Sequence, residues 1–349
     1  MSALVAMPAC AQSVGQWDTY GQINLGALSV ADGASTDAFL GENSNVPGRI
    51  GVWFRTPVDA GAQLSFNLEA GFGMTGSSGF SKHDKSLDVE ISRRALRKFE
   101  MIVDMPAAGR LSLGQGSMAS DGSAGADLSG TGLAHQVAVA DTGGGTALLR
   151  TNGTPSGTTI DDAFSALDGL RRFRVRYDSP ILNGFQASAA YGQEVLRRGN
   201  DNDYYDVAFS YSGDTEPFTA EAKLTYEWVG SIEENLVFSA AVLHKPTGLN
   251  AAFATGREQI GPGRYAYLKL GIIRDIFAVG STAVSVDYYD GRNIAFVGSA
   301  SKAMSIGVVQ KIDPWNMDLF LAHRTFALAG DAENFQDIDA TLLGARWRF

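Results

Sequence analysis

Hydrophobic and polar residues alternate along most of this chain. Between 64 and 72, the apolar residues Leu64, Phe66, Leu68, Ala70 and Phe72 alternate with serine, asparagine, glutamate and glycine. The same alternation returns at 203–211, 218–228, 284–288 and 304–311. A period of two is typical of β-strands with one buried face, and segments of about ten such residues are typical of transmembrane barrels. The pattern therefore predicts an all-β protein.

The alternation and the turn residues between its repeats predict sixteen strands. They lie at 16–30, 46–57, 61–74, 90–104, 109–117, 170–180, 184–192, 203–213, 217–229, 234–246, 247–257, 262–275, 280–290, 301–312, 315–326 and 336–349. An even number of strands closes an antiparallel sheet with both chain ends on one side. The predicted fold is a sixteen-stranded antiparallel transmembrane β-barrel.

The predicted connections alternate between short and long. Residues 59–61 and 182–184 are turn-like, whereas 31–45, 75–89 and 327–335 are longer and polar. Short turns on one side and long loops on the other are the layout of an outer-membrane barrel. The longest connection, 118–169, is rich in Gly, Ser, Thr, Ala and Asp. Loops of this length are usually functional or disordered, and this one is expected to contain a short helix over 161–167 with acids in its first turn.

The last strand separates apolar from basic residues by face. Leu343, Ala345, Trp347 and Phe349 point one way, and Leu342, Gly344, Arg346 and Arg348 point the other. Aromatic residues gather at the lipid interfaces of transmembrane barrels, and polar residues line the lumen. The terminal strand is therefore expected to separate lipid from water.

Composition narrows the possible classes of protein. The 349 residues are 45% hydrophobic, their mean hydropathy is −0.04, and no apolar run is long enough for a transmembrane helix. The net charge of −10 argues against a nucleic-acid-binding surface. Cys10 is the single cysteine, so no intrachain disulfide can form.

The first residues contain a possible signal-peptidase site. Ala9-Cys10-Ala11 has the small-x-small form of such a site, with Gln12 as the mature start. We interpret residues 1–11 as the remnant of a secretory signal and 12–349 as the barrel. The positively charged region of a signal is absent, since the first basic residue is Arg49. The alternative is a loose N-terminus with a chance Ala-x-Ala.

Motifs of enzymes are weak or absent. Residues 71–76 match GxGxxG, but a loop follows where dinucleotide binding needs a helix. There is no Walker A sequence or GxSxG elbow, and the four histidines lack metal-site spacing. We predict no enzyme, no cofactor and no metal site. The oxygen-rich long loop leaves Ca²⁺ binding open, although solvated loop acids are the preferred interpretation.

Basic residues form the main candidate site. Arg172, Arg174 and Arg176 lie opposite Phe173, Val175 and Tyr177 on one strand, and an arginine facing lipid at the bilayer centre costs about 2–4 kcal/mol. These arginines should therefore face the lumen. The predicted basic wall comprises Arg49, Arg94, Lys98, Arg172, Arg174 and Arg176. Alternatively, these residues only solvate strand ends near the rim.

Acids of the long loop form the candidate opposite wall. They are Asp121, Asp127, Asp141, Asp161, Asp162 and Asp168. If the loop, 118–169, folds into the lumen, acids face bases across it. Such an arrangement makes a narrow polar constriction of the kind that charged side chains build in selective pores.

Several motifs resemble a known family. They are Tyr20-Gly21-Gln22-Ile23, Gly48-Arg49-Ile50-Gly51, residues 109–115 (GRLSLGQ), residues 176–180 (RYDSP) followed by Asn183-Gly184-Phe185, and the terminal Phe349. In this order they resemble the general outer-membrane porins of Gram-negative bacteria, over residues 14–349. The stretch from Arg176 to Phe185 is the most specific part.

The resemblance implies a homotrimer in the outer membrane, surrounded by lipid and lipopolysaccharide, with passive diffusion of small hydrophilic solutes. It also implies that the third external loop forms an eyelet. Eyelet bases carry over to Arg49, to Lys98 or Arg94, and to Arg172 or Arg174, whereas Gln22 stands where enteric relatives have a base. The loop acids cannot be assigned individually because this loop is longer than usual. The aromatic chain end resembles the recognition signal for the barrel-assembly machinery.

The leading hypothesis is therefore a water-filled porin whose charge selectivity is set by an acidic loop facing a basic wall. The second is a substrate-specific channel for sugars or organic anions, using the same arginines. A third is an outer-membrane enzyme, for which the histidine spacing offers no candidate site. A soluble β-rich binding protein is the fourth, and extraction without detergent would support it.

Overall fold

The computed structural model describes residues 15–58, 61–81, 87–331 and 333–349. The predicted signal remnant, residues 1–11, lies outside the described residues. No helix in the described part of the chain has the length and apolar character needed to cross a membrane.

The strands run in the following order. They are β1 (Gln16–Ala31), β2 (Thr36–Glu42), β3 (Arg49–Pro57), β4 (Gln63–Ala70), β5 (Leu96–Met105), β6 (Gly109–Ser117), β7 (Ala147–Leu149), β8 (Pro155–Thr159), β9 (Arg171–Asp178), β10 (Phe185–Gln193), β11 (Asp203–Asp214), β12 (Phe218–Val229), β13 (Glu233–His244), β14 (Leu249–Glu258), β15 (Arg264–Phe277), β16 (Gly280–Arg292), β17 (Ala300–Ile312), β18 (Met317–Ala329) and β19 (Ile338–Arg348). The helices are the α-helical turn α1 (Ile160–Ala163) and the 3-10 turns η2 (Ser77–Gly79), η3 (Arg93–Ala95), η4 (Val139–Asp141) and η5 (Asp313–Trp315).

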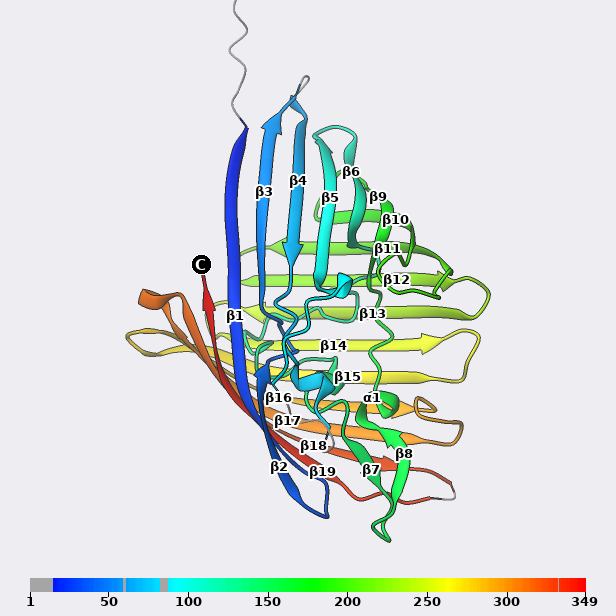
Figure 1. Cartoon of the computed structure of the whole chain (residues 1–349). Helices are drawn as coiled ribbons and strands as arrows, with labels where there is room; N and C mark the ends of the chain where they lie inside the picture. The colour runs from blue at the N-terminus through cyan, green and yellow to red at the C-terminus, as the bar shows by residue number, and fades with distance from the viewer. Residues whose placement is uncertain (1–14, 59–60, 82–86, 332) are drawn as a thin grey trace, which may run out of the picture.

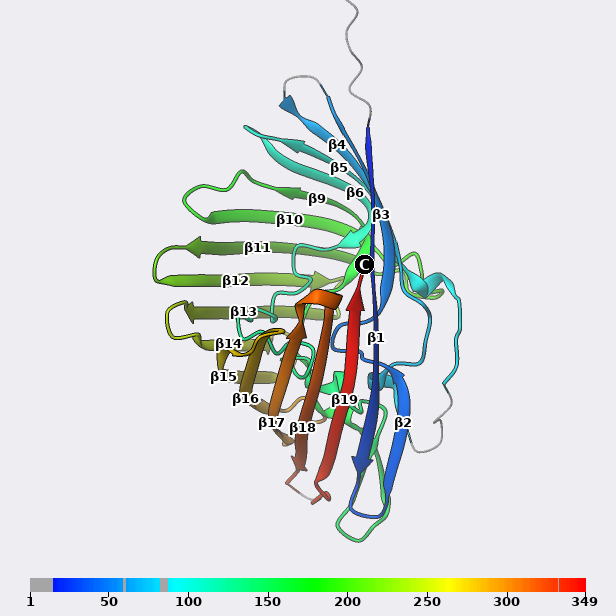
Figure 2. The same ribbon diagram turned by 90° about the vertical axis from the view of Figure 1, so that its left-hand side faces the viewer.

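Neighbouring strands pair antiparallel into one closed barrel (Figure 1). β2 and β3 both pair with β1, and together they form one stave interrupted at 43–48. β19 pairs with the other edge of β1 (Figure 2), and the backbone of Phe349 bonds to that of Gly21. With β2 and β3 counted as one stave, the closed barrel has sixteen strands, as predicted. β7 and β8 form a separate hairpin.

Each stave has an exposed row and a buried row of side chains. On β4, Phe66 and Leu68 are exposed by 43% and 46%, whereas Asn67 and Glu69 are 2% and 4% exposed. The exposed rows are mainly apolar, as expected of a surface that faces lipid. The last strand follows the predicted division, since Trp347 is 47% exposed and Arg346 pairs with the buried Asp318.

Turn chemistry explains the short connections. Asn183 and Gly184 both have positive φ, of 52° and 88°, between β9 and β10. Two residues with positive φ suit the type I′ turn that joins adjacent antiparallel strands. A side chain at Gly184 would also meet the Ser212 carbonyl at 2.5 Å. The turn at 182–184 thus lies where predicted, whereas residues 59–60 of the predicted turn at 59–61 lie outside the described residues.

One predicted connection is wrong. The region 31–45 was expected to be a long loop, but Thr36–Glu42 forms β2, which pairs with Leu25–Ala31 of β1. The strand has only seven residues, and the glycine, asparagine and serine residues around it are typical of loops, so the sequence pattern did not predict it. A neighbour in the sheet therefore decides its conformation more than its own pattern does.

Candidate functional site

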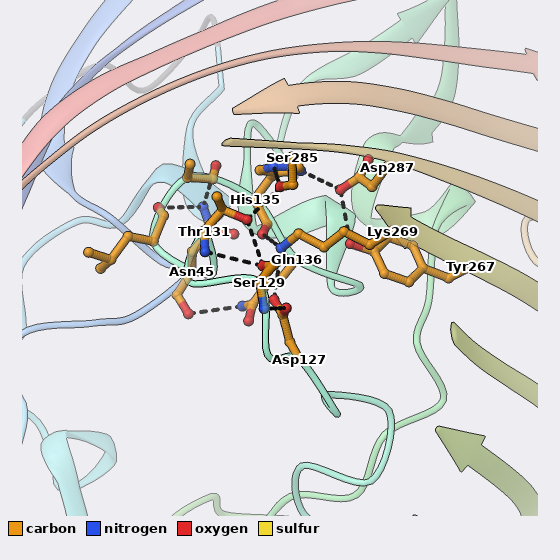
Figure 3. A network of polar contacts seen from close by, with 12 residues as sticks. Asn45, Asp127, Ser129, Thr131, His135, Gln136, Tyr267, Lys269, Ser285 and Asp287 are labelled. Atoms are coloured by element: carbon orange, nitrogen blue, oxygen red, sulfur yellow. Dashed lines mark hydrogen bonds and ion pairs between the residues drawn. The ribbon is translucent and has the colours of Figure 1, made fainter. Parts of the chain in front are cut away.

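A buried polar network holds the long segment, residues 118–169, against β15 and β16 (Figure 3). His135 Nδ1 lies 2.6 Å from Asp287 Oδ2, and His135 Nε2 lies 2.8 Å from Ser285 Oγ. Lys269 Nζ donates to Asp127 Oδ2 at 2.7 Å and to the His135 carbonyl at 2.8 Å. We call these five residues the anchor network. Breaking a buried ion pair costs about 3–5 kcal/mol, so this network fixes the segment.

Asp287 is the hub of the anchor network. Besides His135, its Oδ2 accepts from Arg324 of β18 at 2.8 Å and from the Tyr267 hydroxyl at 3.0 Å. Arg324 and Asp287 are 2% and 3% exposed. One carboxylate thus links the segment to β15, β16 and β18.

Ser285, His135 and Asp287 have the hydrogen-bond order of a hydrolase triad. All three are at most 3% exposed, and Ser285 Oγ is also 2.6 Å from Thr131 Oγ1. A substrate carbonyl therefore has no approach to the serine hydroxyl, and the three residues act as a tether. Sequence spacing could not reveal this arrangement, because it joins the long segment to a distant strand.

Further contacts hold the beginning of the segment. Asp206 of β11 accepts from the Ser120 amide and hydroxyl at 2.7 and 2.6 Å. Arg174 and Arg176 donate to the carbonyls of Ser117 and Met118 at 3.1 and 2.7 Å. The beginning of the segment is therefore fixed to β9 and β11.

The segment also has an apolar core shared with the barrel. Ile160 and Phe164 are 0% and 2% exposed, and the Phe164 ring lies 5.3 Å from Phe326 and 5.4 Å from Tyr289 between centroids. Thr159 and Asp162 form a capping box that shapes α1. This helical turn starts where the sequence predicted a helix, but it ends at Ala163. The segment is thus packed rather than loose.

A cationic cavity of about 580 Å³ lies beside β1, β3, β4 and β5. It is lined by Tyr20, Gly21, Gln22, Arg49, Trp53, Glu69, Arg97, Lys98, Ser117, Arg171, Arg348 and Phe349. Five of these lining residues are basic and one, Glu69, is acidic. Glu69 is already engaged by Arg97 at 2.7 Å and by the Tyr20 hydroxyl at 2.8 Å. The cavity therefore carries an excess of positive charge in a chain whose net charge is −10.

The family model of the Gram-negative porins matches residues 1–327. The chain belongs to this family. It is an outer-membrane protein that forms a channel. A comparison with curated proteins found no match.

Solved structures share the fold of this porin at low sequence identity. An anion-selective porin from Comamonas acidovorans has a TM-score of 0.62 at 14% identity, over 96% of this chain and all of the other. OprB of Pseudomonas putida has a TM-score of 0.64 at 8% identity, over 95% and 94%. The trimer form of OmpT from Vibrio cholerae has a TM-score of 0.58 at 15% identity, over 97% and 100%.

The predicted basic residues of this porin have three different environments. Arg49 and Lys98 line the cationic cavity. Arg172 lies 3.9 Å over the Tyr204 ring and 3.5 Å from Glu194, and Arg174 pairs with Glu100. Arg176 pairs with Asp178 at 2.7 Å. Arg94 is exposed in η3, before β5 begins.

Three basic residues of the cavity, Arg97, Arg171 and Arg348, were not in the predicted basic wall. Glu69 pairs with Lys98 and Ala70 with Leu96, so Arg97 is the extra residue of a β-bulge. A bulge re-aims a side chain, and here both Arg97 and Lys98 line the cavity. Two adjacent basic residues, Arg97 and Lys98, break the alternation of apolar and polar residues. This break was the sign in the sequence from which the bulge could have been predicted. Arg171 precedes the alternating run of β9 and offered no signal of its own.

The predicted acids are mostly engaged in holding the segment. Asp127 pairs with Lys269, and Asp168 accepts from the amides of Gly122, Ser123 and Ala124 at 2.6–3.2 Å. Asp141 accepts from Gln136, and Asp161 and Asp162 are exposed in α1. Asp121 lies 4.0 Å from Arg171. Of the six, Asp121 is the acid that the structure brings to a base of the cavity.

Burial raises the pKa of Asp141 to about 7. Between about pH 4 and 7, Asp141 is therefore protonated in the folded segment and ionised in the unfolded chain. The stability of the folded segment falls as the pH rises through this range. We expect Asp141→Asn to slow amide hydrogen exchange of residues 136–146 several-fold at pH 8, with a smaller effect at pH 5. Equal effects at both pH values would contradict this expectation.

Proposed function

We propose that this porin is a water-filled channel for diffusion of ions and small hydrophilic solutes, and that its cationic cavity makes it favour anions. The observation that carries the proposal is the ratio of five basic to one acidic lining residue. Fixed charges act strongly on ions in a narrow pore, where they replace part of the hydration shell. The similar structure from Comamonas acidovorans is that of an anion-selective porin, which agrees with this direction.

We further propose that the long segment folds into the lumen and narrows it. Its contacts support this, since His135 and Asp127 bind residues of the buried rows of β15 and β16. The apolar core around Phe164 would then occupy the side of β16 to β18. The free passage would remain beside β1 to β5, where the cationic cavity lies.

In this proposal the selectivity arises mainly from the basic residues of the cationic cavity. Asp127 is neutralised by Lys269, and Asp168 is occupied by backbone amides. Asp121 is the acid of the segment that remains near a base of the cavity, Arg171. The sequence predicted a transverse electric field between an acidic and a basic wall. In this proposal the passage instead has a positive potential on one side only.

A substrate-specific channel for organic anions is the second candidate. Trp53 and Tyr20 lie beside the bases of the cavity, and the Arg55 guanidinium stacks 4.5 Å over the Trp53 ring. Aromatic rings next to guanidiniums can hold the flat body of a carboxylate solute. Conductance that saturates with an aromatic carboxylate, and is blocked by it, would favour this candidate.

The wild-type protein in a planar bilayer tests the main proposal. Under a tenfold KCl gradient we expect a reversal potential of the sign that marks chloride as the more permeant ion. The preference should weaken at molar salt, where the Debye length falls to about 3 Å. A cation-selective reversal potential at low salt would reject the proposal.

We also propose a homotrimer, in agreement with the trimer form of OmpT from Vibrio cholerae. The exposed rows of β1 to β5 present Trp17, Leu68 and Phe99, which are 67%, 46% and 63% exposed, as an apolar contact face. The mass of the detergent complex by light scattering, corrected for detergent, tests this. A monomer would contradict it.

A further inference from the structure

Another cavity, of about 290 Å³, lies between the beginning of the long segment and the neighbouring strands β10–β13 (Figure 2). The segment contributes Gly122, Gly125 and Ala126, which add little or no side chain to this space. The polar side chains that the four strands contribute include Gln186, Ser210, Ser212, Glu221, Lys223 and Ser239. We call this space the β10–β13 cavity. It is separate from the cationic cavity, which lies beside β1 and β3–β5.

The sheet register arranges these polar side chains in two neighbouring rows. Ser210 of β11, Lys223 of β12 and Ser239 of β13 lie directly opposite one another. In the next row, Ser212 lies opposite Glu221. Directly opposite side chains have Cβ atoms about 4.5–5.5 Å apart, and residues two apart on a strand share a face at a spacing of about 6.6 Å. One positive and one negative group therefore face the same small space.

Glu221 and Lys223 each use part of their hydrogen-bonding capacity to hold the segment. Glu221 Oε1 accepts from the Asp127 amide at 2.7 Å, and Lys223 Nζ donates to the Asp121 carbonyl at 2.9 Å. In the part of the chain that the structure describes, Glu221 Oε2 and the other two protons of Lys223 have no further partner, and no ion pair joins the two residues. Both residues are half-buried. An opposite charge nearby favours the charged form of each group, so each can bind a ligand group of opposite sign.

We propose that the β10–β13 cavity binds small zwitterions, of which free α-amino acids are the simplest class. The carboxylate of the ligand would accept from Lys223, and its ammonium would donate to Glu221, each through a charge-assisted hydrogen bond. A simple carboxylate or a simple amine satisfies one of these two charges and leaves the other unpaired. The volume is at the lower end of the range of small-molecule pockets, which favours single amino acids over longer peptides.

The β10–β13 cavity lies toward the end of the barrel that carries the short turns. Ile181 and Gly184, at the turn between β9 and β10, line it, and Glu221 is three residues from the start of β12 at Phe218. In outer-membrane barrels the short turns face the periplasm. A zwitterion that enters the barrel from outside the cell would therefore reach this site near the end of its passage.

Competition measured by saturation-transfer NMR on the detergent-solubilised protein tests this site. The probe is L-alanine, and the competitors are L-serine, propionate, ethylamine and glucose. L-Alanine should bind saturably, and L-serine should displace it. Propionate lacks the ammonium, ethylamine lacks the carboxylate and glucose lacks both, so each should displace L-alanine at least about tenfold less effectively than L-serine does.

Two variants remove one charge each and keep the bond to the segment. In Glu221→Gln the amide oxygen can still accept from Asp127, and in Lys223→Gln the amide nitrogen can still donate to the Asp121 carbonyl. Each variant should weaken binding of L-alanine about tenfold or more. Heat-modifiable migration in a gel verifies that each variant is folded.

Gly125→Leu tests the cavity without altering either charge. A Cβ at this position would have the Gly122 carbonyl oxygen, at 3.6 Å, as its nearest atom, so the backbone accepts a side chain. Leucine should fill the cavity and also weaken binding of L-alanine about tenfold. If Glu221 and Lys223 only hold the segment, Gly125→Leu will bind L-alanine as the wild type does.

The matched control is Asp214→Asn combined with Lys245→Gln. It removes an ion pair of 2.7 Å at the end of the same strands, away from the cavity lining, and should bind L-alanine as the wild type does. The proposal is overturned if L-alanine does not bind saturably to the wild type, if Glu221→Gln, Lys223→Gln or Gly125→Leu binds it equally well, or if glucose displaces it as effectively as L-serine. The site does not depend on the selectivity of the cationic cavity, which the reversal potential measures separately.

Discussion

Replacing Arg49, Arg97 and Arg171 with serine is expected to abolish most of the channel's preference for anions. The change removes three of the five basic residues that line the cationic cavity and leaves Glu69 in place. At about 0.1 M salt, where the Debye length is about 10 Å, we expect the chloride-to-potassium permeability ratio to fall at least about fivefold. The reversal potential under a KCl gradient measures this ratio.

Two single variants provide controls for this prediction. Arg94→Ser removes an exposed arginine just before β5, and Arg110→Ser removes one that pairs with Asp104 at 2.5 Å. Neither residue lines the cavity, so each should change the ratio less than Arg97→Ser does. A triple variant with the wild-type reversal potential would remove the cavity from the selectivity mechanism. If Arg94→Ser and Arg97→Ser change the permeability ratio equally, then the position of Arg97 in the β-bulge has no special role in selectivity.

Asp287→Asn is expected to loosen the long segment and to raise single-channel conductance. The substitution removes the negative charge that Arg324 and His135 share. An unpaired buried arginine costs about 3–5 kcal/mol, so the segment should open far more often. We expect larger and noisier current steps in planar bilayers, together with faster amide exchange of residues 127–141.

Asp290→Asn is the matched control on the same strand. Asp290 lies in the exposed row and pairs with Arg292, away from the segment. It should leave conductance and exchange unchanged. If Asp287→Asn has the conductance, noise and exchange rate of the wild type, then the anchor network does not hold the segment in place.

Much of the fold could be predicted from the sequence because each strand has an exposed apolar row and a buried polar row. Such a strand requires apolar and polar residues to alternate with a period of two. The exposed row of Phe66 and Leu68 and the buried row of Asn67 and Glu69 follow that pattern without exception. β2 escaped detection because seven residues between turn-forming segments give too little periodicity. Its conformation depends on pairing with β1, which is a tertiary effect that no local pattern records.

The candidate site was predictable only as a set of charges. The alternation of residues along the strand placed Arg174 in a buried row. It could not show that the Arg174 guanidinium already binds Glu100 and two backbone carbonyls. The loop acids were recognised, yet Asp127 and Asp168 serve as structural partners. Pairing across more than a hundred residues, such as Lys269 with Asp127, depends on the packed loop. The selectivity roles of the cavity residues stay predictions until the channel is recorded.

The apolar core of the long segment also bears on how the barrel assembles. That core includes Leu28 of β1 and Leu342 of β19, together with Leu133 and Phe164 of the segment. β1 and β19 are the two strands that seal the sheet. Contacts of such long sequence separation form late, because the chain must first lose a large amount of entropy. We therefore expect docking of the segment and sealing of the barrel along the seam between β1 and β19 to occur together, late in folding.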